Sequence, residues 1–251
     1  MIEINKIYLE DCLIKLPEID NESIDMILCD LPYGGTQNKW DIIIPFKPLW
    51  EQYERIIKKN GAIVLTASQP FTSLLVTSNL KLFRYELVWR KNKFSNFLDA
   101  NRKPLKQHEN ILVFYKKLPI YNPQYTISKP YERWNTNKSV ENQTNYGKHK
   151  PNHPKSDGKR YPISVLDFDR EERPLHPTQK PVELFKYLIK TYSNEGDLIL
   201  DNASGVGTTG ISCLETNRNY ILIEKEKKFY DISIERIKKW HENKKNIFDI
   251  I

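Results

Sequence analysis

The stretch LILDNASGVGTTG at residues 198–210 decides the fold, because it joins a short apolar run to a glycine-containing turn. The run is typical of a buried strand, and the segment after the turn has the spacing of a helix. Gly205, Gly207 and Gly210 are three of only nine glycines in the chain, and small residues let the backbone approach a ligand closely. A strand, a glycine turn and a helix in succession predict a nucleotide-like ligand at the carboxyl edge of a sheet.

Two acidic residues indicate which ligand this turn binds. The three glycines formally meet the dinucleotide fingerprint G-x-G-x-x-G, so a nicotinamide enzyme has to be considered. Asp201 argues against it, because a carboxylate just before the turn would repel a pyrophosphate but can receive an amino group. Glu224 ends the next apolar run about 20 residues further on, where an acid can accept both hydroxyls of a ribose. An adenosine joined to a cationic amino acid satisfies both positions, and S-adenosylmethionine has both parts.

Short apolar runs alternate with amphipathic stretches along most of the chain, as in α/β proteins. The runs predicted to be strands are 4–10, 24–30, 62–68, 85–91, 110–116, 197–202 and 220–224. The segments predicted to be helices are 46–59, which the pair Asn60-Gly61 would end, 181–193, 208–217 and 227–241. We therefore expect an α/β fold with a Rossmann-like seven-strand sheet flanked by helices.

Composition excludes several classes of protein. The chain has 251 residues, 39% hydrophobic and 28% charged, which suits one soluble domain with a real core. No apolar run approaches the roughly 20 residues that cross a bilayer, and the start lacks the apolar block of a secretory signal, so we expect a cytoplasmic protein. Cys12, Cys29 and Cys213 are odd in number and too widely spaced for a zinc knuckle. We expect them to be reduced packing residues.

Positive charge is concentrated in the middle of the chain. Residues 81–160 contain 18 basic and 6 acidic residues, whereas the rest contains 21 basic and 26 acidic residues. A basic middle between acidic ends favours a polyanion partner whose binding surface is built mainly from the middle. Composition alone leaves a solvated lysine-rich surface as the alternative.

The segment at about 118–165 differs from the rest, because Pro, Asn, Lys and Tyr dominate it and periodicity is nearly absent. Its aromatic residues are too many for a typical disordered linker, which predicts a second, looser module. They are Tyr121, Tyr125, Tyr131, Trp134, Tyr146 and Tyr161. His149 and His153 have the spacing of a helical metal pair, but Pro151 and Pro154 break any helix there, so we expect no metal.

Three motifs, in this order, resemble those of the beta-class S-adenosylmethionine-dependent amino-methyltransferases of DNA. They are DLPYG at 30–34, HPTQKP at 176–181 and DNASGVGTTG at 201–210. In the related RNA and protein-glutamine methyltransferases the glycine turn precedes an Asn-Pro-Pro-Tyr motif, so the order here favours the DNA enzymes. The resemblance covers nearly the whole chain. It implies a catalytic part of the methyltransferase domain at 1–117, a target recognition module at 118–170 and a cofactor-binding part at 171–251.

The tetrapeptide Asp30, Leu31, Pro32 and Tyr33 is the catalytic motif that this resemblance implies. The lone pair of adenine N6 is delocalised into the ring, so the nitrogen is a poor nucleophile until its geometry moves toward tetrahedral. The Asp30 carboxylate and the Leu31 backbone carbonyl can each accept one N–H hydrogen bond and so aim the lone pair at the methyl group. The amine is buried in a duplex, so the base must be rotated out, and we expect it to stack on Tyr33.

The resemblance also implies a set of cofactor contacts. Asp11 is explained equally well as a helix N-cap, and His176 is expected to be structural. The block at 176–181 would lie beside the methionine end of S-adenosylmethionine. The expected cofactor contacts are Asp11, Cys12, Thr178, Gln179, Lys180, Asp201, Ala203, Gly205, Gly207, Thr208, Thr209 and Glu224.

Two departures from the family pattern bear on these expectations. Leu31 replaces the first proline of the usual Asp-Pro-Pro-Tyr, but the family uses the backbone carbonyl there, which leucine also has. Asn202 and Ala203 stand where the family has Pro-Phe, and the missing phenylalanine removes a packing surface beside the cofactor. We expect either weaker cofactor binding or another aromatic side chain in its place.

The function implied is site-specific methylation of adenine N6 in double-stranded DNA. Cytosine N4 methylation remains an alternative, although beta-class cytosine enzymes usually have serine at the position of Asp30, and a catalytically silent DNA-binding subunit is another. We expect a loop over the cleft to bind phosphates through Lys91, Lys93, Arg102, Lys103 and Lys106. The sequence leaves open whether a cognate restriction endonuclease accompanies the enzyme and whether it forms a homodimer.

Overall fold

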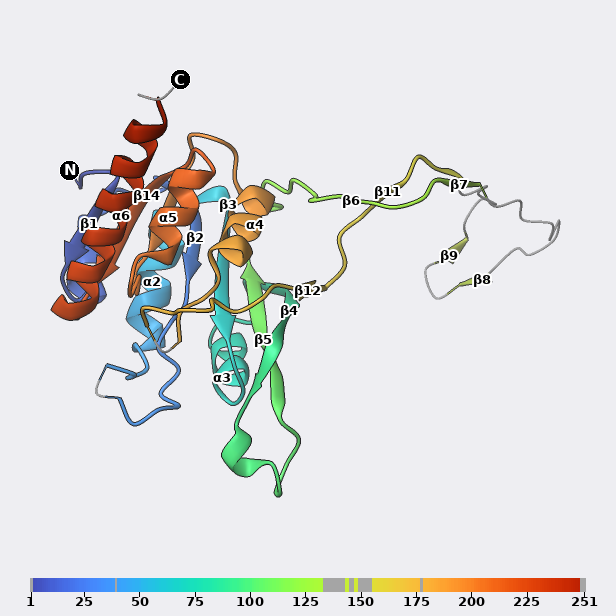
Figure 1. Ribbon diagram of the computed structural model, residues 1–251, viewed down its shortest axis with the longest axis horizontal. Helices are drawn as coiled ribbons and strands as arrows, with labels where there is room; N and C mark the ends of the chain where they lie inside the picture. Colours follow the sequence, from blue (N-terminus) through green and yellow to red (C-terminus); the bar gives the residue numbers. More distant parts are fainter. Residues whose placement is uncertain are drawn as a thin grey trace. The chain divides into compact units, whose positions relative to one another are not determined.

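The computed structural model describes residues 2–38, 40–132, 143–144, 147–148, 155–176 and 178–248. Contacts within the described part divide the chain into two compact units. The larger unit comprises Met1–Asn122 and Ser164–Ile251, and the smaller unit comprises Pro123–Ile163. The larger unit has the predicted α/β architecture, with helices on both faces of one sheet (Figure 1).

Among the described residues, one eight-stranded sheet forms the centre of the larger unit, and all seven predicted strands belong to it. In spatial order the strands are β1 (Lys6–Leu9), β14 (Asn219–Glu224), β13 (Leu198–Asp201), β2 (Ile24–Cys29), β3 (Ile57–Ala67), β5 (Lys106–Phe114), β4 (Phe83–Ser95) and β12 (Val165–Asp167). Strand β12 is additional, because three residues are too few to show a period in the sequence. It pairs in parallel with β4, so residues 165–167 belong to the sheet and not to the module in which we expect them.

Neighbouring strands β1, β14, β13, β2 and β3 run parallel and end at the same edge of the sheet. Strand β5 is antiparallel to both β3 and β4. The chain leaves β13 toward β14 on one side and leaves β2 toward β3 on the other, which opens a crevice between their carboxyl ends. The tetrapeptide after β2 and the glycine turn after β13 therefore meet at this edge.

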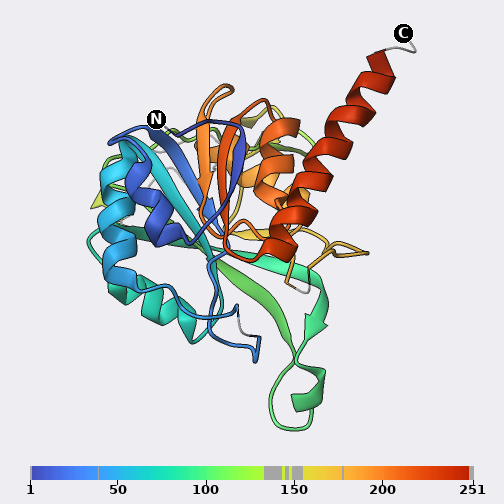
Figure 2. The same cartoon turned by 90° about the vertical axis from the view of Figure 1, so that its left-hand side faces the viewer.

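Helices cover both faces of the sheet (Figure 2). One face carries α1 (Cys12–Lys15), the 3-10 helix η1 (Leu16–Glu18), α2 (Phe46–Ile56) and α3 (Phe71–Ser78), and the other carries α4 (Val182–Tyr192), α5 (Thr208–Glu215) and α6 (Lys227–Phe248). Each face buries its own apolar core, which includes Tyr53 of α2 on the first face and Phe185 of α4 on the second. The sheet is therefore buried on both sides and rigidly supports its carboxyl edge.

Helix α2 ends earlier than the sequence indicates. It stops at Ile56, and β3 begins at the next residue, so Asn60-Gly61 lies inside a strand and does not end the helix. A Cβ at Gly61 would come within 2.7 Å of the Asp25 backbone oxygen. Glycine is needed there because β2 passes too close for any side chain.

The cysteines behave as predicted. Cys12, Cys29 and Cys213 all lie in the described part of the chain, and each is buried and free. Burial raises the pKa of all three thiols, which keeps them protonated and inert. No helix among the described residues is long and apolar enough to cross a membrane.

The smaller unit contains short antiparallel ladders. They are β6 (Thr126–Ile127) with β11 (Lys159–Arg160), β7 (Tyr131–Glu132) with β10 (Lys155–Ser156), and β8 (Gln143–Thr144) with β9 (Gly147–Lys148). Arg160 lies over the Tyr131 ring at 4.7 Å, and the rings of Tyr125 and Tyr161 meet edge to face at 5.1 Å. Target recognition by this unit remains a prediction. Trp134, Tyr146, His149, Pro151, His153 and Pro154 lie outside the described residues.

Replacing Gly61 with alanine should lower the free energy of unfolding by about 1–3 kcal/mol, because the new methyl group overpacks the contact with Asp25. Urea unfolding followed by circular dichroism measures the change. Gly35→Ala is the matched control, since a Cβ there meets nothing within 4 Å. Equal stability of the two variants would contradict the steric role of Gly61.

Candidate active site

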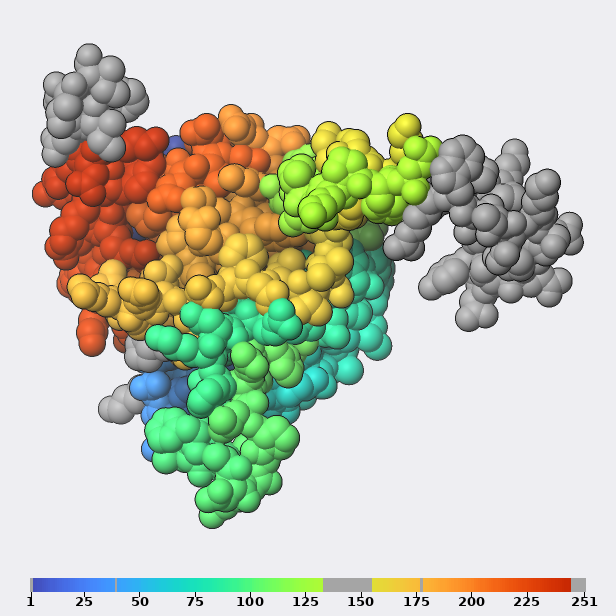
Figure 3. Space-filling model, turned by 45° about the vertical axis from the view of Figure 1, so that its right-hand side comes forward, coloured from blue at the N-terminus to red at the C-terminus, as the bar shows by residue number. Residues whose placement is uncertain are grey.

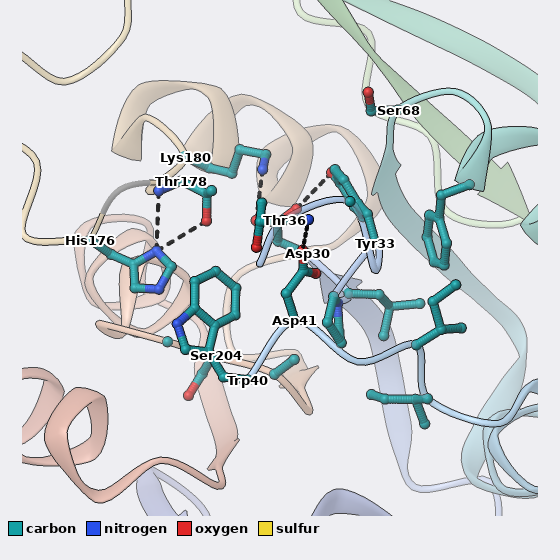
Figure 4. A pocket seen from close by; sticks show the side chains of 18 of the residues that line it. Asp30, Tyr33, Thr36, Trp40, Asp41, Ser68, His176, Thr178, Lys180 and Ser204 are labelled. Carbon is teal, nitrogen blue, oxygen red and sulfur yellow. Dashed lines mark hydrogen bonds and ion pairs between the residues drawn. The ribbon is translucent and has the colours of Figure 1, made fainter. Parts of the chain in front are cut away.

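Acidic residues lie at the ends of parallel strands, or directly after them, at one edge of the sheet. Asp30 comes directly after β2, Asp201 ends β13 and Glu224 ends β14. All three line a cavity of about 550 Å³, together with Asp11, which follows β1. Figure 4 shows the part of this cavity around Asp30. The topology thus brings side chains from both ends of the chain into one site.

Both oxygens of the Asp30 carboxylate accept hydrogen bonds. Oδ1 accepts from the Tyr33 hydroxyl at 2.8 Å and from the Thr66 hydroxyl of β3. Oδ2 accepts from Lys180 Nζ at 2.6 Å (Figure 4). Asp30 and Lys180 are 150 residues apart in the sequence, so this bond joins the tetrapeptide to the loop before α4. Three donors, one from β3 and two from separate loops, hold the carboxylate in one orientation.

Lys180 belongs to a buried chain of alternating charges. Its Nζ lies 3.3 Å from Glu109 Oε2, as an ion pair without hydrogen-bond geometry. Glu109 Oε1 accepts a hydrogen bond from Lys91 Nζ at 2.6 Å. The side chains of Lys91 and Lys180 are only 8% and 5% exposed. Removing one member would leave a buried charge without its partner, which is costly.

Burial and pairing act in opposite directions on these charges. Burial alone would raise the pKa of Glu109, but Lys180 and Lys91 lower it to about 2. Burial alone would lower the pKa of Lys180, but Asp30 and Glu109 raise it. Lys180 is therefore a full positive charge beside Asp30 at neutral pH.

The Tyr33 ring forms one wall of the cavity. One of its faces stacks on Phe71, with ring centroids 5.1 Å apart, and Lys180 Nζ lies 5.4 Å from the Tyr33 centroid. Burial and the nearby Asp30 raise the pKa of the Tyr33 hydroxyl, so it remains a hydrogen-bond donor. A base can stack only on the face that Phe71 leaves uncovered, and this role for Tyr33 stays a prediction.

The loop after the tetrapeptide is held by Asp41. Its carboxylate accepts backbone N–H hydrogen bonds from Gly34 at 2.9 Å and from Thr36 at 2.7 Å. Burial opposes the charge on Asp41, but these hydrogen bonds outweigh it and lower its pKa. Asp41 therefore fixes the backbone that directly follows Tyr33.

An aromatic cluster closes another side of the cavity. The His176 ring contacts Trp40 at 4.8 Å and Phe229 at 4.3 Å between centroids. His176 Nδ1 accepts a hydrogen bond from the Thr178 backbone at 3.2 Å, and burial lowers the pKa of the imidazole (Figure 4). These contacts are compatible with the structural role expected of His176, which stays a prediction. Within the described residues no group of three or more His, Cys, Asp or Glu is placed to hold a metal ion, and the absence of a metal stays a prediction.

Asp201 is held by the turn that follows it. Its Oδ1 accepts the Ala203 N–H at 3.1 Å, and its Oδ2 accepts a hydrogen bond from the Thr209 hydroxyl. The residue is 2% exposed, and burial raises the pKa of Asp201 to about 6 although the Thr209 hydrogen bond opposes the shift. Thr209 lies behind Asp201 and away from the cavity lining, so it affects the site only by orienting this carboxylate.

Glu224 and Asp11 each combine a local hydrogen bond with a place in the cavity wall. Glu224 accepts the backbone N–H groups of Gly205 and Glu226, both at 2.7 Å. Gly205 has a φ of +52°, and a Cβ added there would meet nothing within 4 Å, so open space lies over the turn. Asp11 caps α1 by accepting the Leu13 N–H at 2.9 Å and also lines the cavity. Both interpretations of Asp11 are therefore compatible with the structure.

Two buried polar atoms of this region have no hydrogen-bond partner among the described residues. They are Asn202 Nδ2 and Ser204 Oγ, and both residues line the cavity. Buried polar groups are normally paired, so unpaired ones at a cavity wall point to a polar ligand. Together with Asp201 and Glu224 they provide the donors and acceptors that an adenosine with an amino acid group requires. The residues present fit S-adenosylmethionine.

The cavity collects most of the residues expected from the sequence. It is lined by Asp30, Leu31, Pro32 and Tyr33, and by ten of the twelve expected cofactor contacts. The exceptions are Gly207 and Thr209. Gly207 has a φ of +76°, and a Cβ there would come within 2.9 Å of Ser233 Cβ. It allows α5 to pack closely on α6, so the geometry does not support its expected cofactor contact.

Two of the basic residues expected to bind phosphates lie inside the site. Lys91 is buried, and its ammonium is already paired with Glu109, so the structure does not support the phosphate contact expected of it. Lys106 lines the cavity and donates to the Ser68 hydroxyl, and burial lowers its pKa. The residue type alone does not show whether a lysine is buried and paired or exposed to solvent.

The other three basic residues are exposed on the hairpin that joins β4 to β5. Lys93, Arg102 and Lys103 all have exposed side chains. Lys103 also forms an ion pair with Asp99 at 3.0 Å. The phosphate contacts expected of these residues stay predictions, and their exposure makes them accessible to a large polyanion.

Sequence reasoning does not find Thr66, Glu109, Trp40 and Asp41. Thr66 lies within a run predicted as a buried strand, and Glu109 directly precedes another. For Glu109 the sequence offers one indication, namely a charged residue at the start of an apolar run. Trp40 and Asp41 lie in an irregular loop without periodicity. Their roles become visible only when their partners are brought close by the fold.

Comparison with known proteins identifies the family of this chain. The family model described as DNA methylase, for N6 and N4 methyltransferases, matches residues 24–235. DNA adenine methyltransferase YhdJ of Escherichia coli (strain K12) is 28% identical over 246 residues, covering 90% of this chain and 80% of that protein. Type II methyltransferase M.HinfI of Haemophilus influenzae is 28% identical over 279 residues, covering 97% of this chain and 71% of that protein.

Solved structures share the fold. The M1.HpyAVI-SAM complex matches with a TM-score of 0.62 and 23% identity, covering 92% of this chain and 98% of that one. The cytosine-N4-specific PvuII DNA methyltransferase matches with a TM-score of 0.66 and 14% identity, covering 91% and 84%. The expected Rossmann-like methyltransferase sheet is confirmed. Because the family model spans the tetrapeptide, the His-Pro-Thr-Gln-Lys-Pro block and the glycine turn, this chain belongs to the DNA methylase family of N6 and N4 methyltransferases.

Proposed function

We propose that this DNA methylase transfers the methyl group of S-adenosylmethionine to N6 of an adenine that is rotated out of double-stranded DNA. The observation that carries the proposal is the Asp30 carboxylate, which lines the same cavity as Asp201 and Glu224. An amine acceptor and a cofactor site in one cavity are what a direct methyl transfer requires.

The nucleophile is an exocyclic amine, which is weak because its lone pair is delocalised into the base. The Asp30 carboxylate and the Leu31 backbone carbonyl each accept one of its N–H groups, which leaves the lone pair directed at the methyl carbon. When bound, S-adenosylmethionine supplies that carbon on a positively charged sulfur. The sulfur would leave as a neutral thioether when the nitrogen takes the methyl group, and Asp30 or solvent would accept the proton that the amine then loses.

Lys180 determines how the amine meets Asp30. Tyr33 and Thr66 hold Oδ1, so the amine approaches Oδ2, which Lys180 contacts at 2.6 Å. A carboxylate oxygen has room for two hydrogen bonds, so Lys180 and the amine share Oδ2. Glu109 fixes Lys180 in turn, and the carboxylate is therefore in position before the base arrives.

The cofactor residues divide by chemistry. Glu224 accepts the ribose hydroxyls, Asp201 receives the amino group and Asp11 contacts the adenine. The packing surface lost at Ala203 is supplied by the aromatic cluster, in which Phe229 lines the same cavity. Phe229 would therefore replace the phenylalanine that the family has at the position of Ala203.

Adenine is favoured as the target base. The fold alone does not decide, because the structurally similar PvuII enzyme is specific for cytosine N4. The aspartate at position 30 and the relative YhdJ, which is named a DNA adenine methyltransferase, support adenine N6. A catalytically silent subunit is not favoured, because Asp30, Tyr33 and the cofactor acids are intact and share one cavity.

Duplex DNA is the expected substrate, and relatives of the type II class favour a role in restriction and modification. M.HinfI and M.HpaI are named type II methyltransferases, a class that protects sites from a restriction endonuclease. We assign the reading of the DNA sequence to the unit Pro123–Ile163, whose described residues interleave aromatic and basic side chains. A cognate endonuclease and a homodimer stay predictions.

Replacing Asp30 with alanine should reduce methyl transfer by at least about 100-fold, because the variant loses a positioned hydrogen-bond acceptor for the amine. Transfer of labelled methyl to DNA measures the rate of the folded variant, which is less stable because Lys180 loses one of its two buried partners. Calorimetry below its unfolding temperature should show nearly unchanged affinity for S-adenosylmethionine. Asp20→Ala, which removes an exposed carboxylate, is the control and should keep wild-type activity. Turnover of the Asp30 variant within tenfold of wild type would refute the assignment.

Cofactor affinity should fall as the pH decreases through about 6. The pKa of Asp201 is raised to about 6 in the free protein, so the carboxylate that receives the amino group is ionised above this pH and protonated below it. Titration calorimetry between pH 5 and 8 should show up to about one decade of affinity lost per pH unit below 6. Asp201→Asn should bind weakly and lack this step. Parallel pH profiles of the two proteins would place the titrating group elsewhere.

DNA affinity should fall steeply with salt, and part of the slope should come from the β4–β5 hairpin. Neutralising Lys93, Arg102 and Lys103 together should reduce the slope of log affinity against log salt by up to about 2.7, at about 0.9 for each phosphate contact. The matched control neutralises exposed lysines outside the basic middle, namely Lys47, Lys59 and Lys238. A hairpin variant with the same slope as this control would show that these cations are only solvated surface.

A further inference from the structure

The tip of the β4–β5 hairpin exposes apolar side chains to solvent. Phe94, Phe97 and Leu98 are 58%, 71% and 85% exposed. The hairpin, coloured green, projects from the larger unit in Figure 3. Large apolar side chains that lie next to one another on a protruding segment mark an interaction surface.

The tip is ordered by its own backbone hydrogen bonds. The hairpin closes where Ser95 pairs with Lys106, and Asn96 then adopts a φ of +65°. The short helix η2 (Phe97–Asp99) follows, and the Lys103 N–H donates to the Asp99 carbonyl at 3.0 Å. Phe97 and Leu98 are therefore presented outward before any partner binds, which lowers the entropy cost of binding.

The charge around the tip indicates the kind of partner. Residues 93–106 contain four basic residues and one acidic residue. An apolar tip between exposed cations fits a nucleic-acid duplex, which has an anionic backbone and apolar base faces. A second copy of this chain would bring like charges together at the same place, which argues against a contact between copies.

The tip also lies next to the catalytic cavity. Ser95 and Asn96 line the cavity that contains Asp30, and Phe97 is the next residue along the chain. A base that enters this cavity leaves a gap in the stack of the duplex, and that gap faces the mouth of the cavity. Apolar side chains inserted between bases are a known way to stabilise such an unstacked step.

We propose that Phe97 and Leu98 enter the duplex and fill the space that the flipped-out base leaves. This inference rests on the proposed function and extends it to the partner strand and neighbouring bases. Phe97 and Leu98 replace the lost stacking, while Lys93 and Arg102 contact the phosphates on either side of the gap. The hairpin is therefore a device for base rotation in addition to a binding surface.

The test compares two duplexes that differ only at the target adenine, which is paired in one and mismatched in the other. Their sequence comes from mapping methylated sites in DNA from cells that express the enzyme. The double variant Phe97→Ala with Leu98→Ala should lose at least about tenfold in kcat/KM on the paired duplex. On the mismatched duplex it should stay within about threefold of wild type, because an unpaired base costs less to rotate out.

Leu80→Ala is the matched control, since Leu80 is 63% exposed in the turn after α3, outside the hairpin. It should match wild type on both duplexes. Equal losses of kcat/KM by the double variant on the two duplexes, or no loss on either, would overturn the gap-filling role. A wild-type dimer that becomes a monomer in the double variant, as seen by sedimentation, would overturn it too. If the wild-type enzyme methylates adenine in neither duplex, the proposed function itself has failed, which is a different result from any of these.

Discussion

The ion pair between Lys180 and Asp30 is the interaction on which the site depends. It joins a side chain before α4 to the first residue of the tetrapeptide, 150 residues away. Because Lys180 is buried, its charge is stable there only with partners on more than one side, and Glu109 provides the other one. The sheet supplies those partners by placing the ends of β2 and the start of β5 at the same edge.

The cavity has two parts, and each part comes from a different pair of strands. In the proposed reaction, Asp30, Tyr33 and Thr66 at the ends of β2 and β3 form the part that meets the target base. Asp201 and Glu224 at the ends of β13 and β14 form the part that meets the cofactor. The two sets are adjacent because β2 and β13 are paired neighbours. A methyl group has to travel only between groups that the sheet already holds side by side.

Much of the fold could be predicted from the sequence, because buried strands and amphipathic helices leave clear periods in the chain. Strand β12 could not be predicted, because three residues are too few to show a period. The early end of α2 could not be predicted either, because Asn60-Gly61 can end a helix or, as here, lie in a closely packed strand.

In the site, the tetrapeptide and the glycine turn could be identified because their residue types are distinctive at fixed spacing. The burial of Lys91 and its pairing with Glu109 could not, because a lysine looks the same in sequence whether water or a carboxylate surrounds it. Trp40 joins His176 only after a loop without periodicity folds back. The residues that escaped prediction are therefore those whose partners are distant in the chain.

The strand order has a consequence for how the protein is made. Strand β1 pairs with β14, and β2 pairs with β3 on one edge and with β13 on the other. Strand β1 and one edge of β2 therefore stay unpaired until β13 and β14 have been synthesised. On the ribosome the chain emerges from its N-terminus, so a sheet of this connectivity cannot close until β13 and β14 have been synthesised. A chain interrupted before residue 176 would contain Asp30 but neither Lys180 nor the glycine turn. The full set of side chains around Asp30 is therefore assembled only after Lys180 and the glycine turn at 201–210 have been synthesised.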